Sequence, residues 1–509
     1  MCAVESERSE GSWAARHGTL IWIALGAALA VLLRAPWFDA PLGRDEGGVA
    51  LVARAWHGSG PFPYGSYFLD RPPLLPALYR LAGDSETGIR VLGCLAAILL
   101  VTVSTLLAVR VAGRAAALWA AGISGVLASS FAIRSVFTPA ELLAAVPSAA
   151  SVLLLLIALE SSSHRLRLLT GAGALAATAL LVKQSFGDAL AAGAVALVAG
   201  RALGVTWRET AKRAAAYGAG VLALLVALLV WAWVENTSLY SVYYAMFGFR
   251  LDAAATLSHS GVATRLGRLE SPFLTSGLAI ACILGAWGIA RWRGLPLVRL
   301  VLGGWIVAGL VGVALGGSYW PHYLIALVPG ITAAAAIALA RHPRVGVVAA
   351  CAIALPTAVH AFAVARDDSA DHAQKAAVTI ARYIRARALP HQTLYVLYAK
   401  VNVLYYAGLD DPFPYNWSLM MEAVPGAEAR LRQLLGSSRR PTWVVRLSTT
   451  RSLGLDRSGA TRRLLAQHYR TARRVCGATV LLDRGAAARP SPPSTGACGP
   501  RRSLRSDTP

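Results

Sequence analysis

Two adjacent carboxylates, Asp45 and Glu46, stand a short way after the first long apolar segment of the chain. A carboxylate can take the proton from an attacking hydroxyl group, and carboxylate oxygens also bind divalent cations. The structural alternative is helix capping, in which Asp45 would accept hydrogen bonds from free backbone N–H groups. Composition alone gives the two interpretations equal weight, so the elements around the pair must decide between them.

A helix is expected directly after the acidic pair. Val49, Val52, Ala53 and Trp56 recur at helical spacing. This spacing predicts a helix in the membrane interface, with its apolar side on lipid or on the helical bundle. Asp45 would stand at the start of this helix.

The next segment combines aromatic, basic and proline residues. Tyr64 and Tyr67 lie in a stretch rich in glycine and aromatic residues, where anchoring in the membrane interface is the simplest role. Arg71 follows Asp70 and precedes two prolines that stiffen the turn. The Arg71 guanidinium group has the donor geometry that suits phosphate oxygens. An interfacial arginine that only pairs with Asp70 would have the same sequence.

The composition is that of a membrane protein. Of the 509 residues, 56% are hydrophobic and 15% are charged, whereas a soluble chain carries about 25% charged residues. The mean hydropathy is +0.52. The formal net charge of +23 would suggest nucleic acid in a soluble protein, but much of it falls in short loops between apolar runs. Anionic lipid, or a lipid-linked anionic substrate, is therefore the expected partner, and no nucleic acid is expected.

Eleven apolar runs predict membrane-spanning helices, of which the fifth and sixth are short. An uncleaved anchor is preferred for the first run over a cleaved signal peptide, because no clean small-residue cleavage site follows it. Basic residues gather in alternate loops, which marks those loops and the N-terminus as cytoplasmic. Residues 36–88, 235–271 and the chain after about residue 365 would then lie outside the plasma membrane. The runs cover residues 20–33, 89–109, 115–133, 141–159, 168–182, 186–200, 214–234, 272–290, 300–316, 321–340 and 345–364.

The predicted fold is therefore a polytopic α-helical membrane protein with a small extracytoplasmic α/β domain at its C-terminal end. We expect a disordered cytoplasmic N-terminus (1–18), a transmembrane module (19–365), the α/β domain (366–485) and a disordered tail (486–509). Within the α/β domain the patterns predict helices at Ala376–Ala388 and Glu428–Leu435, strands at Thr393–Leu397 and Thr442–Leu447, and a further strand that includes Leu404–Tyr406.

Two of the six cysteines, Cys476 and Cys498, fall in the polar C-terminal region. They could form a disulfide if that region lies outside the cytoplasm. The sequence fixes no geometry for the pair, so the pairing stays open.

The order of elements around the acidic pair resembles the first external loop of GT-C superfamily membrane glycosyltransferases. A first span is followed by the acidic pair, an interfacial helix, an aromatic stretch, a basic-Pro-Pro-Leu turn and Gly88-Ile89-Arg90-Val91 at the next span. The resemblance is to the branch of protein O-mannosyltransferases and aminoarabinose (ArnT-like) transferases. A lysine is usual there where this chain has Arg71, and the substitution keeps the positive charge.

Three later segments extend the resemblance over most of residues 20–365. Each stands at the end of a span, where relatives place polar residues that face the site. The segments are Thr138-Pro139-Ala140-Glu141-Leu142, Leu181-Val182-Lys183-Gln184 and Ser318-Tyr319-Trp320-Pro321-His322-Tyr323-Leu324.

The resemblance implies transfer of a hexose or pentose from a polyprenyl-phosphate donor to a protein, lipid or cell-wall glycan acceptor outside the membrane, typically with inversion at the anomeric carbon. Asp45 would be the base or the carboxylate that orients the acceptor, and Glu46 a supporting carboxylate or metal ligand. The other residues expected at the substrate are the phosphate-holding candidates Arg71, Lys183 and His322, the hydrogen-bond donor Tyr323, and Tyr64, Tyr67, Gln184 and Glu141.

The residues at the ends of later spans have structural alternatives of about equal weight. Lys183 ends an apolar run, where lysines often extend their ammonium group toward water. Glu141 follows Pro139 as an acid in the first turn of a helix would. His322 stands beside Trp320 and Tyr323, as a residue of an interfacial aromatic belt would.

The sequence has no His/Cys cluster with metal-ligand spacing and no glycine-rich nucleotide loop. No nucleotide cofactor is therefore expected, and a divalent metal ion at Asp45, Glu46 or Glu141 stays open. The rival functions are a membrane transporter, a flippase for lipid-linked glycans, and a protein that only binds such a glycan. Transporters more often show repeats and helices broken near mid-membrane, whereas the polar residues here gather at the external ends of spans.

Overall fold

The computed structural model describes residues 2–161, 163–258, 261–366, 372–398, 400–490 and Cys498. The chain forms two compact units, each assembled from three stretches of sequence. The helical unit contains residues 1–38, 89–230 and 263–363. The mixed unit contains residues 39–88, 231–262 and 364–509. The first loop, 36–88, which the sequence places within the transmembrane module, falls almost entirely in the mixed unit with the C-terminal region.

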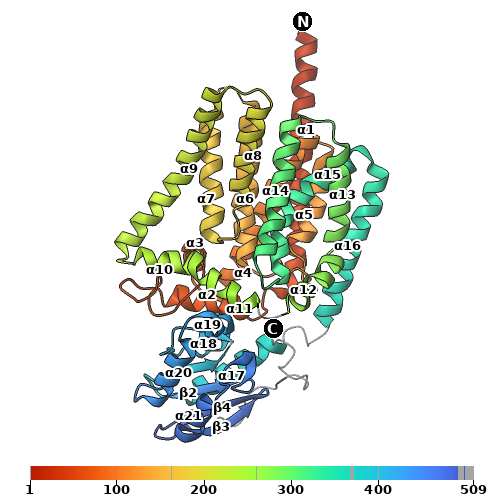
Figure 1. Cartoon of the computed structure of the whole chain (residues 1–509). Coiled ribbons are helices and arrows are strands. Elements are labelled where there is room, and N and C mark those ends of the chain that lie inside the picture. Colours follow the sequence, from red (N-terminus) through yellow and green to blue (C-terminus); the bar gives the residue numbers. More distant parts are fainter. Residues whose placement is uncertain are drawn as a thin grey trace. The chain divides into compact units, whose positions relative to one another are not determined.

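All eleven apolar runs of the sequence form helices in the helical unit, and Figure 1 shows several of them running side by side. Runs of alanine, leucine and valine satisfy their backbone groups internally as helices, which is the requirement for crossing lipid. The elements are α1 (Cys2–Arg34), η1 (Ala35–Trp37), α4 (Glu86–Ala112), α5 (Ala116–Leu127), α6 (Ala140–Glu160), α7 (Arg165–Val182), α8 (Asp188–Ala202), α9 (Trp207–Val234), α12 (Val262–Thr275), α13 (Leu278–Arg291), α14 (Pro296–Leu315), η3 (Pro321–Leu327), α15 (Val328–Arg341) and α16 (Pro343–Arg366).

The sequence predicted about eleven spans. Among the described residues, eight helices are long and apolar enough to cross a membrane, or nine if the bent pair α12–α13 is one span. The helices α12 and α13 meet at an angle of 79°. The helices α5 and α8 have 12 and 15 residues, or roughly 18 and 22 Å, against a hydrocarbon core of about 30 Å. The chain is an integral multi-pass membrane protein in which two of the predicted apolar runs form helices shorter than the bilayer core.

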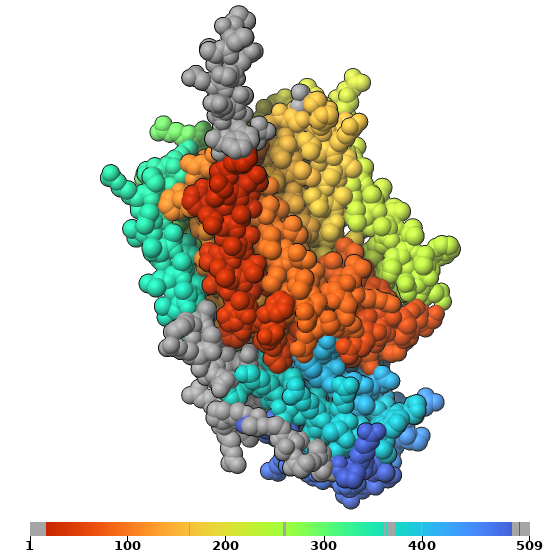
Figure 2. All heavy atoms as spheres, turned by 180° about the vertical axis from the view of Figure 1, so that it is seen from behind, coloured from red at the N-terminus to blue at the C-terminus, as the bar shows by residue number. Residues whose placement is uncertain are grey.

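The first helix begins earlier than the sequence suggested. Residues 1–18 were expected to be disordered, yet α1 begins at Cys2, because the alanine, glutamate and arginine residues before Leu20 favour continuation of the helix. Figure 2 shows the red α1 along the surface of the helical unit, with large apolar side chains such as Leu20 and Leu32 exposed. Gly26 permits close contact with α5, since a Cβ atom there would lie 2.6 Å from the backbone oxygen of Ala121.

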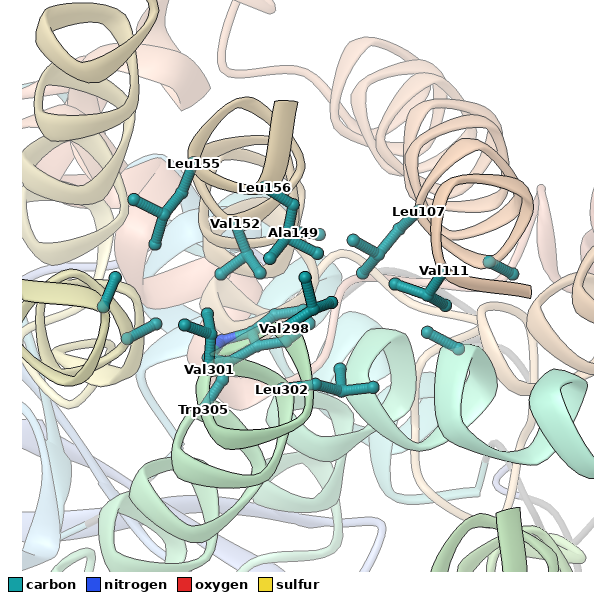
Figure 3. Close-up of a cluster of buried hydrophobic side chains, with 14 of the residues drawn as sticks. Leu107, Val111, Ala149, Val152, Leu155, Leu156, Val298, Val301, Leu302 and Trp305 are labelled. Atoms are coloured by element: carbon teal, nitrogen blue, oxygen red, sulfur yellow. The ribbon is translucent and has the colours of Figure 1, made fainter. Parts of the chain in front are cut away.

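The aliphatic core of the helical unit surrounds the buried acid Asp188. Figure 3 shows side chains of α4, α6 and α14 pointing into one cluster. Trp305 of α14 donates a hydrogen bond from Nε1 to Asp188 Oδ2 at 2.6 Å, and Ser148 Oγ of α6 donates to the same oxygen at 2.9 Å. Asp188 begins α8, so these bonds tie three helices together at a polar point within an apolar core.

Arg34, the last residue of α1, organises the segment between α5 and α6. Its guanidinium group is buried and would be costly there without acceptors. It donates to Ser129 Oγ at 3.1 Å, to the backbone oxygens of Val136, Phe137 and Ala128 at 2.8, 3.2 and 3.2 Å, and to that of Ser135.

The mixed unit combines short helices with a four-stranded sheet in the order β1-β2-β4-β3. β1 and β2 are parallel, while β4 is antiparallel to β2 and β3. The elements are α2 (Arg44–Arg54), α3 (Leu74–Leu81), α10 (Leu239–Tyr243), the π-helical turn η2 (Tyr244–Gly248), α11 (Phe249–Ser258), α17 (His372–Arg387), β1 (Leu394–Leu397), α18 (Val401–Ala407), α19 (Ser418–Ala423), α20 (Ala427–Gly436), β2 (Trp443–Arg446), η4 (Ser452–Gly454), α21 (Ala460–His468), β3 (Tyr469–Val475) and β4 (Ala478–Asp483).

The sequence predicted the first two strands of this sheet but not the others. Leu404–Tyr406, expected in a strand, lies in helix α18, because packing against α2 outweighs the local preference of Leu and Tyr for extended backbone. The hairpin β3–β4 was missed because β3 is an edge strand that exposes Arg470, Arg473 and Arg474. Its turn, Cys476-Gly477, has φ values of 47° and 81°, as a two-residue hairpin turn requires.

Cys476 and Cys498, whose pairing the sequence left open, are joined by a disulfide. The predicted disordered tail, 486–509, lies for the most part outside the described residues.

Replacement of Arg34 by methionine is expected to destabilise the protein by about 3 kcal/mol, since buried carbonyl oxygens lose a charged donor. Thermal unfolding in detergent should show a lower Tm than for the parent. Arg114→Met, at an exposed position, is the matched control and should leave the Tm unchanged. An unaltered Tm in Arg34→Met would contradict this role.

Candidate functional site

The two acids of the first loop have different surroundings in the mixed unit. The helix α2 is capped by Gly43, whose backbone N–H donates to Glu46 Oε2 at 3.0 Å. Glu46 is buried, so it closes the first turn of α2 in the way that a glutamate of a capping box does. The capping role that the sequence offered to Asp45 therefore belongs to Glu46.

Asp45 is the second residue of α2 and keeps contact with solvent. Its side chain is 50% exposed, in contrast to the buried Glu46. Its Oδ1 atom accepts a hydrogen bond from Trp417 Nε1 at 3.2 Å and lies 3.8 Å from Arg44 Nε. A carboxylate in the first turn is also favoured by the helix dipole. Asp45 is thus an oriented, solvent-accessible carboxylate.

The apolar side of α2 packs on protein within the mixed unit. A Cβ atom at Gly47 would lie 2.7 Å from Cβ of Asn402, and one at Gly48 would lie 2.2 Å from Cζ2 of Trp417 and 2.6 Å from Cγ1 of Val401. Both glycines are therefore required for the close approach of α2 to α18 and Trp417. The sequence offered lipid or the helical bundle for this side of the helix, whereas the contacts observed at Gly47 and Gly48 are with other residues of the mixed unit.

Arg71 belongs to a cluster of one acid and two arginines. Asp70 is buried, and its Oδ2 atom lies 2.6 Å from Arg71 Nη1 and 2.5 Å from Arg250 Nη2 of α11. Two guanidinium groups around one carboxylate carry a net positive charge. Because arginine presents several donors in a fixed fork, such a cluster can bind a phosphate group while it keeps its carboxylate partner.

Tyr64 and Tyr67, expected at the substrate, are buried and bond to backbone groups. The Tyr64 hydroxyl donates to the backbone oxygen of Arg71 at 2.5 Å. The Tyr67 hydroxyl accepts from the backbone N–H of Asp411 at 3.0 Å. Burial raises the pKa of Tyr64 well above its ordinary value and that of Tyr67 to about 12, so both stay neutral. In this conformation they fix the loop that carries Arg71.

A second cluster lies within the helical unit. Lys183 Nζ, at the end of α7, lies 2.6 Å from Glu141 Oε1 in the first turn of α6, and both side chains are buried. His322 Nε2 lies 3.6 Å from the same oxygen. The Tyr323 ring contacts His322 and lies 5.2 Å from the Lys183 ammonium group. Four of the five residues predicted in later spans thus form one cluster, and the fifth, Gln184, is half-buried next to Lys183.

Comparison with known proteins places this geometry in context. A family model described as dolichyl-phosphate-mannose-protein mannosyltransferase matches residues 70–233. ArnT from Cupriavidus metallidurans bound to undecaprenyl phosphate is 16% identical with a TM-score of 0.66, covering 92% of this chain and 99% of its own. Its apo state is 18% identical with a TM-score of 0.64, covering 90% and 97%.

The archaeal oligosaccharyltransferase AglB from Archaeoglobus fulgidus, in complex with an inhibitory peptide and a dolichol-phosphate, is 15% identical with a TM-score of 0.53, covering 85% of this chain and 70% of its own. A search of curated proteins finds no match. The chain has the GT-C fold. The resemblance stated from the first loop is thereby confirmed, and identities this low carry the fold alone.

Within this GT-C chain, three residues near the predicted site were not found from the sequence. Arg250 lies 180 positions from its partner Asp70, and Trp417 lies 372 positions from Asp45. Asn402 packs under Gly47 and donates from Nδ2 to the backbone oxygen of Leu42 at 3.2 Å. All three come from later stretches of the mixed unit, and no local motif marks them.

The metal assignment stays a prediction. Among the described residues, no group of three or more His, Cys, Asp or Glu side chains has the geometry to hold a metal ion. Of the three acids offered as ligands, Glu46 caps α2 and Glu141 pairs with Lys183. Asp45 is therefore the acid with the greatest exposure to an incoming ligand.

Loss of the ammonium partner of Glu141 should be costly, because the buried carboxylate loses its charged contact at 2.6 Å. Lys183→Met is expected to destabilise the protein by about 3–5 kcal/mol, measured as a fall in Tm. The double variant Glu141→Gln/Lys183→Met should recover most of the loss, and Lys212→Met, at an exposed position, should have no effect. A single variant as stable as the parent would refute the coupling.

A pH-dependent contribution to stability is expected from Glu422 in α19, where burial raises the pKa to about 7. Because the folded-state pKa lies above the ordinary value, the protonated form stabilises the fold at low pH, and this contribution is lost as the pH rises through about 7. Glu422→Gln should therefore have a higher Tm than the parent at pH 8 and a similar Tm at pH 4.5. Equal differences at both pH values would contradict the assignment.

Proposed function

We propose that this protein is a membrane glycosyltransferase that moves a sugar from a polyprenyl-phosphate donor to a hydroxyl group of a glycan, lipid or protein acceptor. The observation that carries the proposal is the presence, in one compact unit, of an oriented exposed carboxylate and a phosphate-compatible arginine pair. The match to the mannosyltransferase family model over residues 70–233 supports the same class of reaction.

The proposed chemistry assigns one task to each group. The acceptor oxygen attacks the anomeric carbon as the bond from that carbon to the phosphate oxygen breaks. Asp45 takes the proton of the acceptor hydroxyl. The polyprenyl phosphate leaves with the bonding electrons, and its added charge is stabilised by Arg71 and Arg250. Attack opposite the leaving group inverts the anomeric centre. Glu46 supports Asp45 indirectly, because it fixes the first turn of α2.

We choose Arg71 and Arg250 over Lys183 and His322 as the residues that bind the phosphate, because the two groups differ in how their cations are paired with carboxylates. Asp70 shares its single negative charge between two arginines. Lys183 is neutralised by Glu141 at 2.6 Å in a buried pair. A phosphate at Lys183 would have to displace that carboxylate, at a cost that the arginine cluster avoids. Lys183, His322 and Tyr323 lie in the helical unit, and their contact with the donor stays a prediction from the sequence.

We propose that the mixed unit lies outside the plasma membrane and that the N-terminus is cytoplasmic. The basic loops identified in the sequence support this orientation. The mixed unit also exposes aromatic side chains at the end of α9 and in α10: Trp233, Tyr240 and Tyr243 are 81%, 71% and 52% exposed. Such residues favour the boundary between lipid and water, the depth at which a donor with its tail in the bilayer presents its phosphate.

Transfer by purified protein tests the proposal. The protein is offered a panel of polyprenyl-phosphate sugars with a hydroxyl acceptor, and glycosylated product is measured. Asp45→Asn is expected to retain donor binding and to lose transfer by at least about 100-fold, the usual contribution of a general base. Glu46→Gln should lower both Tm and transfer, since it weakens the cap of α2.

The alternatives give different results in the same preparation. A flippase in vesicles would move the lipid-linked sugar across the bilayer without glycosylating the acceptor, and a binding protein would retain donor without product. Full transfer in Asp45→Asn and Glu46→Gln would refute the assignment of the acidic pair.

A further inference from the structure

We propose that Trp417 is a positioning residue for Asp45, so that the C-terminal part of the chain contributes directly to the site. This inference rests on the proposed function, in which Asp45 accepts the proton of the acceptor. The residue lies in the loop before α19, and no motif of the first loop points to it.

The hydrogen bond selects an orientation for the carboxylate. Asp45 is half-exposed, and an exposed aspartate side chain ordinarily samples several rotamers. The bond from Trp417 Nε1 to Oδ1 at 3.2 Å favours one of them. A base that must meet an acceptor hydroxyl loses rate if its oxygen is displaced by about 1 Å. Trp417 therefore affects the reaction through Asp45 without touching the substrate.

The indole ring is itself fixed against the same face of α2. Asp45 and Gly48 are three residues apart and so lie on one side of the helix. Trp417 bonds to the first and contacts the second, since Cζ2 and Cη2 would lie 2.2 and 2.8 Å from a Cβ atom at position 48. The indole ring thus fixes the start of α2 relative to the C-terminal region through two contacts, one with Asp45 and one with Gly48.

The backbone of Trp417 is held in turn by α19. Trp417 is the N-cap residue of this helix and has extended backbone angles. Its carbonyl oxygen accepts hydrogen bonds from the backbone N–H groups of Met420 and Met421 at 3.1 and 3.3 Å. Both methionines are buried in the core of the mixed unit. The orientation of Asp45 is consequently tied to the packing of the C-terminal domain.

Trp417→Phe tests the inference, because it removes the N–H donor and keeps an aromatic side chain at this position. The kcat for sugar transfer, normalised to donor-binding sites, is expected to fall about tenfold, while the KM for donor and the Tm stay near the parent values. The matched control is Trp443→Phe. Trp443 donates from Nε1 to Gln392 in the same unit and is buried in β2, so kcat should be unchanged.

A second variant changes the residue of α2 that contacts the Trp417 ring. Gly48→Ala places a methyl group against the ring and should also lower kcat more than it raises KM. An unchanged kcat in Trp417→Phe, or a loss matched by Trp443→Phe, would overturn the positioning role while transfer by the parent protein stands. If the parent protein shows no sugar transfer, both the proposed function and the positioning role of Trp417 are contradicted.

Discussion

The buried carboxylate of Asp70 joins two distant segments of the mixed unit. It forms ion pairs with Arg71 of the first loop and with Arg250 of α11, two segments that are far apart in the sequence. A single buried acid would be costly in this position, and a single arginine would only neutralise it. The interaction that joins the two segments also brings two arginines together, and in the proposed function these arginines bind the phosphate of the donor.

The two acids Asp45 and Glu46 also differ in their contacts, although they are adjacent in the sequence. The Glu46 carboxylate accepts a hydrogen bond from the backbone N–H of Gly43 and caps the N-terminus of α2. Asp45 therefore does not have this capping role. Asp45 stays exposed and oriented by Trp417. The close approach that permits this arrangement depends on Gly47 and Gly48, where any side chain would meet α18 or the indole ring. Two adjacent acids with the same chemistry thus acquire different roles from their position on one helical turn.

The sequence was sufficient for the helical architecture because lipid requires each apolar run to form a helix. Composition did not reveal that the helices α5 and α8 are shorter than the bilayer core. The order of residues along the chain named Asp45, Arg71 and the Glu141–Lys183–His322 group as candidates. It could not identify Arg250 or Trp417, because their partners lie in distant segments and only packing brings them together. The edge hairpin β3–β4 was missed because its outward arginines conceal the alternation of a strand.

Affinity for undecaprenyl phosphate tests the central claim most directly, namely that the cluster around Asp70 holds the phosphate of a lipid donor and that Asp45 acts only in transfer. Binding to purified protein should weaken at least tenfold in Arg71→Gln/Arg250→Gln and stay within about twofold in Asp45→Asn, because loss of charged hydrogen bonds to an anion costs about 1.5–3 kcal/mol each. Equal affinity in the arginine double variant and the parent would contradict the claim.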